Sequence, residues 1–110
     1  MKFLYEIEQL KNTPEGRKAL FMSFEQTQRD GGVFHRNYEV VARGGIEAGS
    51  RQEAAEKLFR KYNLEIPADY TGRSLSVSDI VTLIDPKETS SWFCDNLGFV
   101  KIKEFADEQN

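Results

Sequence analysis

The residues with the most chemical potential in this 110-residue chain lie in one serine-rich stretch, residues 67–81. Asp69 and Asp79 flank Gly72-Arg73-Ser74, and paired carboxylates do general acid–base work where the fold brings them together. In a functional interpretation, Arg73, Ser76, Ser78 and Asp79 converge on one polar pocket. In a structural interpretation, Ser76, Ser78 and Asp79 bond nearby backbone groups and fix the turn that leads into a strand. We favour the structural interpretation.

Two further side chains are candidates for chemistry. His35 is the single histidine and precedes an expected strand, but a general base needs an orienting partner that the sequence does not supply, so we expect a surface loop residue. Cys94 lies in the apolar run Trp92-Phe93-Cys94, which is typical of an inert core cysteine. Their separation is unlike zinc-ligand spacing, and the glycine pairs lack the lysine of a phosphate loop. We therefore expect no metal and no cofactor.

The first half of the chain contains signals for several short elements. Alternation of apolar and polar residues over residues 2–9 predicts a strand with one buried face. Thr13-Pro14 begins a helix of at most two turns. Residues 20–24 are either the end of that helix or a short strand, and we favour the strand. Ser23 then caps a helical turn that runs through Gln28 and stops at Gly31-Gly32.

The clearest local signal is the capping box formed by Ser50 and Glu53. This box begins a helix over residues 51–62, and Asn63 ends the helix. A strand over residues 37–43 precedes it, and Gly44-Gly45 closes that strand. The helix carries one apolar stripe. We place Phe59 at the centre of this stripe and expect its truncation to be costly; the stripe consists of Ala55, Leu58, Phe59 and Tyr62.

The last part of the chain predicts a hairpin of residues 79–84 and 90–94 around a turn at residues 85–88. A final strand covers residues 99–103, and the polar tail, residues 106–110, is expected to fray. The sequence thus predicts an α+β fold: a mainly antiparallel sheet of four to six strands with one long helix packed on a face. We expect a single domain over residues 1–110.

Composition limits the classes of function. Fifteen Lys and Arg against eighteen Asp and Glu give a net charge of −3, which suits neither a cationic nucleic-acid binder nor a strongly acidic DNA mimic. A minor hypothesis is weak nucleic-acid binding, in which the phosphate backbone contacts a surface formed by Arg29, His35, Arg36 and Arg43. With one cysteine, no signal peptide and no apolar run of membrane-spanning length, we expect a cytoplasmic protein in a reducing compartment that has no membrane partner.

Residues 72–81, with flanking segments at residues 59–63, 67–70 and 92–99, resemble the YodL-like family, small domains of bacterial mobile elements and phages. The resemblance extends over residues 38–105, although Trp92-Phe93-Cys94 departs from a tyrosine-rich pattern in the second hairpin strand. Members of the family occur together with proteins that carry counter-defence and antirestriction functions, and the family is assigned from this association. No catalytic residue set is established for it, so the resemblance supplies none.

The resemblance implies a non-enzymatic counter-defence inhibitor in a bacterial host cell, of the anti-CRISPR or antirestriction type. It would act by binding a host protein such as a CRISPR or restriction component. Because aromatic and arginine side chains dominate protein interfaces, the candidate partner-binding residues are Arg73, Tyr70 and Trp92. The alternative is a small ligand-binding or enzymatic domain that uses the polar loop between Asp69 and Asp79.

Overall fold

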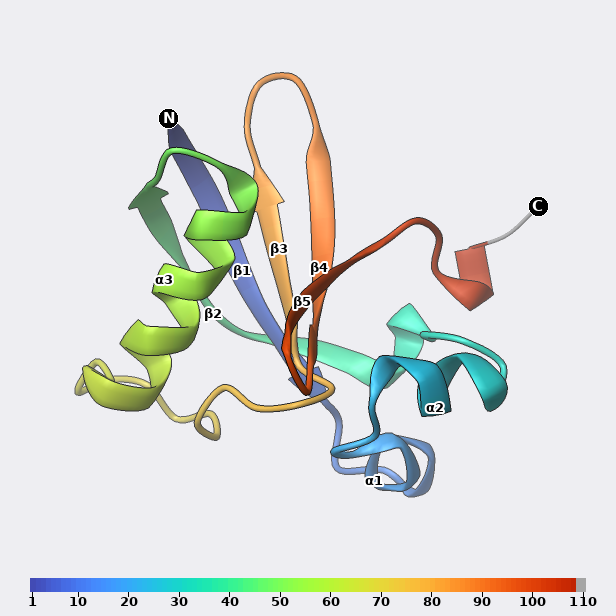
Figure 1. Ribbon diagram of the computed structural model, residues 1–110. Coiled ribbons are helices and arrows are strands. Elements are labelled where there is room, and N and C mark those ends of the chain that lie inside the picture. Colours follow the sequence, from blue (N-terminus) through green and yellow to red (C-terminus); the bar gives the residue numbers. More distant parts are fainter. Residues whose placement is uncertain (109–110) are drawn as a thin grey trace.

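A five-stranded sheet in the order β2-β1-β3-β4-β5 forms the centre of the computed structural model, which describes residues 1–108 (Figure 1). Every neighbouring pair of strands is antiparallel. The strands are β1 (Lys2–Leu10), β2 (Tyr38–Glu47), β3 (Ile80–Ile84), β4 (Thr89–Asp95) and β5 (Gly98–Ile102). The fold is therefore α+β, and the hairpin predicted from the sequence is β3 and β4.

Helices cover both faces of this sheet. The long helix α3 (Arg51–Leu64) packs along one face, whereas α1 (Pro14–Ala19) and α2 (Phe24–Arg29) gather at the lower end of the other (Figure 1). Two 3-10 turns, η1 (His35–Asn37) and η2 (Ala106–Glu108), lie beside each other at the edge of this second layer. None of the helices in residues 1–108 is long and apolar enough to cross a membrane.

The two layers enclose two hydrophobic clusters. Alternate residues of β1 face α3, so the first cluster contains Phe3, Tyr5, Ile7, Ala48, Ala54, Leu58, Tyr62, Leu75, Val81 and Leu83. The second, smaller cluster contains Leu10, Val33, Tyr38, Ile80, Phe93 and Ile102, with Phe24 and Phe105 packed against it. The register of β1 against β2 shifts between Ile7 and Glu8, and all residues from Ile7 to Leu10 are buried. The end of β1 is thus covered on both faces.

Three expected elements differ in the structure. Residues 20–24 form no strand: Phe21 has a positive φ of 63°, and Ser23 caps α2, which begins at Phe24. The strand β2 does not close at Gly44-Gly45 but continues to Glu47, because β1 pairs with it along that whole length. Residues 106–108 do not fray but form η2; residues 109–110 of the expected tail lie outside the described residues.

The start and the end of α3 also differ in detail. Ser50 Oγ accepts the Glu53 N–H at 3.1 Å as predicted, but the Glu53 carboxylate accepts the N–H of Gly49 at 3.0 Å. The predicted reciprocal bond to the Ser50 N–H is replaced by this one. The helix continues one residue past Asn63, whose side-chain amide donates to Phe59 O and Leu75 O and ties the helix end to the following loop.

The position of Phe59 on the apolar stripe was predicted wrongly. Phe59 is 40% exposed and meets the ring of Phe99 edge-on at the rim of the sheet, whereas Leu58 is fully buried. The true inner face is formed by Ala54, Ala55, Leu58 and Tyr62. With Leu58 at the centre of this face, the 3.6-residue repeat places Phe59 at its edge, where the ring is only partly covered.

We expect Leu58→Ala to lower the free energy of unfolding by about 2–5 kcal/mol, because it leaves a cavity in the first cluster. Phe59→Ala should cost only about 1 kcal/mol, since its ring is already partly hydrated. Urea unfolding of both variants measures the difference. Equal losses, or a larger loss for Phe59→Ala, would contradict this assignment of the helix face.

Candidate functional site

Buried Gln9, at the end of β1, holds the main chain of Arg73. Its Oε1 accepts the Arg73 N–H at 3.0 Å, and its Nε2 donates to Arg73 O at 2.9 Å. The hydroxyl of Tyr70 donates to the same carbonyl at 2.6 Å. A Cβ on Gly72 would lie 2.4 Å from Tyr70 Oη, so only glycine fits beside this arrangement. The backbone of Arg73 is thus fixed at both its N–H and its carbonyl, while the residue itself is exposed.

Asp79 lies fully buried behind Arg73. One carboxylate oxygen, Oδ2, accepts the Ser76 N–H at 2.9 Å and the Gln9 amide at 3.0 Å. The other, Oδ1, accepts no hydrogen bond and faces Arg73 Nη2 at 3.7 Å. Burial raises the pKa of Asp79 to about 6, although the Ser76 N–H, Arg73 and Gln9 all favour its charged form. Asp79 therefore bonds the main chain of the turn at Ser76 and also attracts the Arg73 guanidinium.

Backbone strain is concentrated beside Arg73. Ser78 and Phe21 are the non-glycine residues with positive φ in the described chain, 84° and 63°, and the Phe21 N–H donates to Ser78 Oγ at 3.1 Å. Such conformations cost about 1–3 kcal/mol each and cluster at functional sites. Here they turn the side chain of Phe21 outward, 59% exposed, with the Arg73 guanidinium 5.8 Å from its ring centroid. We call Arg73 and Phe21 the Arg73 anchor.

The three predicted partner-binding residues differ in accessibility. Arg73 is exposed, but Tyr70 and Trp92 are half-buried. Tyr70 packs edge-on against Tyr62 with ring centroids 4.9 Å apart, and Trp92 packs against the cluster under α3. Phe21 does not stand out in the sequence, because a strand over residues 20–24 gives no sign of the positive φ that accompanies its exposed ring. Asp69 is exposed and lines a cavity beside Tyr62, so the two aspartates of the serine-rich stretch occupy different environments.

Positive charge surrounds the Arg73 anchor. A cavity of about 350 Å³ beside it is lined by Lys11, Arg17 and Arg73 together with Leu10 and Leu20. In the part of the chain that the structure describes, no carboxylate lines this cavity. A protein with a net charge of −3 therefore carries a local cationic surface at this point.

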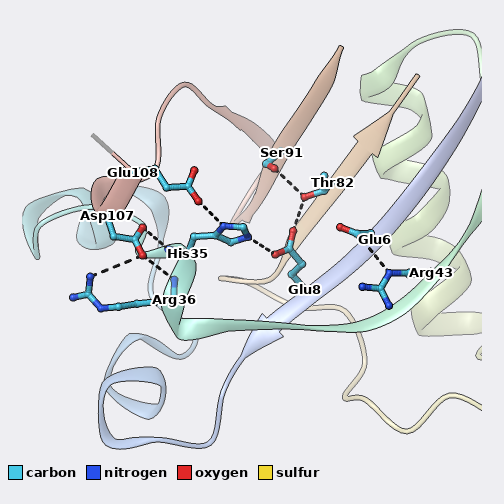
Figure 2. A network of polar contacts seen from close by, with 9 residues as sticks. All are labelled: Glu6, Glu8, His35, Arg36, Arg43, Thr82, Ser91, Asp107 and Glu108. Carbon is cyan, nitrogen blue, oxygen red and sulfur yellow. Dashed lines mark hydrogen bonds and ion pairs between the residues drawn. The ribbon is translucent and has the colours of Figure 1, made fainter. Parts of the chain in front are cut away.

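A second polar arrangement lies on the sheet face opposite α3 (Figure 2). Glu8 on β1 is 3% exposed, and its Oε2 accepts the Thr82 hydroxyl at 2.5 Å. Thr82 Oγ1 lies 2.8 Å from Ser91 Oγ on the next strand. The other oxygen of Glu8 lies 2.9 Å from His35 Nε2. The alternation of β1 pointed to a solvated Glu8, but η1 and the C-terminal segment cover this end of the strand.

His35 joins Glu8 to the C-terminal segment. Its Nδ1 lies 2.7 Å from Glu108 Oε1, and its ring stacks on Phe105 at 4.5 Å between centroids. Burial lowers the pKa of His35, but the hydrogen bonds to Glu108 and Glu8 outweigh this, and the pKa is raised overall. Both ring nitrogens donate to a carboxylate only in the imidazolium, which has no lone pair to act as a base. Asp107 completes the contact by accepting the N–H groups of His35 and Arg36 at 2.8 and 2.9 Å.

The remaining candidates offer little chemistry. The groove of about 900 Å³ beside His35 is lined by acidic and basic side chains, several of them already paired. Cys94 is buried, and burial raises the pKa of its thiol to about 12. Among residues 1–108, no group of three or more His, Cys, Asp and Glu side chains is arranged to hold a metal ion.

Comparison with known proteins gives one match. The model of the YodL-like domain family matches residues 4–105, nearly the whole chain. Neither the curated proteins nor the solved structures contain a match to this chain.

Titration of Asp79 provides a test of its buried position. Because the folded state raises its pKa from 3.8 to about 6, folding favours the protonated form, and this stabilisation is lost as the pH rises through about 6. We expect the unfolding free energy of the wild type, relative to Asp79→Asn, to fall by about 2–3 kcal/mol between about pH 4 and pH 7. Urea unfolding across this range measures it, and a difference that is flat or rises with pH would refute the assignment.

We also expect the pKa of His35 to lie above 6.5 and to fall when Glu108→Gln removes one of its two carboxylate partners. An NMR titration of the imidazole ring measures both values. Glu104→Gln is the matched control, since Glu104 lines the same groove without bonding His35. An unchanged pKa in Glu108→Gln would show that the C-terminal segment does not dock through His35.

Proposed function

The chain belongs to the YodL-like domain family, and we propose that it is a non-enzymatic accessory protein of a phage or mobile element that inhibits a host defence protein by binding it. It acts in the cytoplasm of the bacterial host, and its partner is a component of a CRISPR or restriction system. Inhibition proceeds by occlusion of the partner's working surface rather than by chemistry.

The fixed geometry of the Arg73 anchor is the observation that carries this proposal. A buried glutamine, a tyrosine hydroxyl and a buried aspartate hold one exposed arginine, and two strained residues turn an aromatic ring beside it. Arginine and aromatic side chains carry much of the binding energy at protein interfaces. Because the main chain is already ordered, binding loses less conformational entropy than it would at a mobile loop.

The charge around the Arg73 anchor indicates the chemistry of the partner. Lys11 and Arg17 lie along the same cavity as Arg73, so the complementary surface is acidic, with an apolar spot for the ring of Phe21. Association should therefore be faster at low salt, since exposed charges are screened at high ionic strength.

Phage plating in strains with and without a CRISPR or restriction system tests the function. In the strain whose system is the target, we expect the wild-type protein to raise plating efficiency at least about tenfold. Arg73→Ala should abolish the effect, because loss of a central interface arginine weakens binding by roughly 30-fold. Arg60→Ala, another exposed arginine, should retain it.

Binding of the purified target protein to immobilised wild type and variants then locates the surface. Equal activity of Arg73→Ala and wild type would refute the role of the Arg73 anchor. No protection in any defence-bearing strain would refute the counter-defence function, and binding of DNA or RNA in place of the target protein would refute a protein partner.

A further inference from the structure

A cluster of hydrogen-bond donors lies at the C-terminal end of α3, beside residues of β1 and β2. Tyr5 Oη and Tyr62 Oη lie 2.8 Å apart, and Lys61 Nζ lies 3.4 Å from Tyr5 Oη. The ammonium group of Lys61 also lies 5.8 Å and 5.7 Å from the ring centroids of Tyr5 and Tyr62. Lys61 thus directs its charge toward two tyrosines, and within residues 1–108 it forms no ion pair.

This cluster has more hydrogen-bond donors than acceptors. When one tyrosine donates to the other, one O–H of the pair remains unused whichever way the bond runs. Burial raises the pKa of Tyr62, so the hydroxyl of Tyr62 is protonated at neutral pH. Lys61 has three N–H donors, and Tyr5 Oη accepts only one of them. The cluster therefore has donors left for a further acceptor group.

Space for such a group is present. A cavity of about 350 Å³ is lined by Tyr5, Lys61, Tyr62 and Gly44, among others. A Cβ at Gly44 would lie 2.7 Å from Tyr5 Oη, so glycine at this point of β2 is what lets the hydroxyl lie against the strand. Asp69 lines the same cavity and is exposed, so one negative charge stands near the opening.

We propose that this cavity binds a small molecule through an oxyanion, a phosphoryl or carboxylate group, that accepts from Lys61 and from the free hydroxyl of the Tyr5–Tyr62 pair. The ammonium group supplies the opposite charge, and the hydroxyl fixes the orientation. The site is separate from the Arg73 anchor, and its occupancy does not depend on the proposed inhibition of a host protein.

Titration of ¹⁵N-labelled full-length protein at constant ionic strength tests the site. Inorganic phosphate and acetate are the two probes, and chloride is the reference anion. We expect saturable shifts of the Gly44 and Gly45 amides with at least one probe, and the stronger probe identifies the class of oxyanion. Lys61→Met should abolish the shifts. Lys57→Met, one turn earlier on α3, should leave them unchanged because Lys57 bonds Glu47 O instead.

Two further variants separate binding from folding. Tyr62→Phe retains the ring packing but removes a hydroxyl, and it should weaken binding while the protein stays folded. Asp69→Asn removes the opposing charge and should tighten binding about threefold. No saturable shift with either probe in the wild type would overturn the proposal, as would equal responses of Lys61→Met and Lys57→Met.

Discussion

Burial of two consecutive polar residues, Glu8 and Gln9, at the end of β1 is the constraint on which the rest of the structure depends. Successive residues of a strand point to opposite faces, so each side chain must be satisfied by a different layer. An unpaired polar group in such a position costs several kcal/mol. On one face Thr82 and His35 satisfy Glu8, and on the other Arg73 and Asp79 satisfy Gln9.

The two requirements bring distant segments to the sheet. On the Glu8 face, His35 connects the strand to η2, so the chain after β5 returns to cover the second cluster with Phe105. On the Gln9 face, the serine-rich stretch lies against the strand end and presents Arg73. In each case, a polar side chain that is buried in the middle of the fold requires a hydrogen-bond partner, and a distant segment supplies it.

The loop over residues 67–73 links the two sites that we propose. Tyr70 donates to Arg73 O through its hydroxyl and packs its ring against Tyr62, so it supports the Arg73 anchor from one side and the donor cluster of Tyr5, Lys61 and Tyr62 from the other. This explains why the aromatic residue that looked like an interface residue in the sequence is half-buried. Its role is to position neighbours, whereas Phe21 presents the exposed ring.

Local chemistry determined much of the fold in the sequence alone. The alternation of β1, the Ser23 and Ser50 caps and the β3–β4 hairpin act between residues close along the chain, so their signals are complete within a short window. The bond between Asp79 and Ser76 is equally local, since it spans three residues. Only the tertiary structure decided the exposure of Phe59, the continuation of β2 through Gly44-Gly45, the two carboxylate partners of His35 and the bonds that hold the main chain of Arg73. These features depend on partners far along the chain, such as Gln9 and Arg73, which are 64 positions apart. No pattern within one segment contains the desolvation and close approach that the other segment imposes.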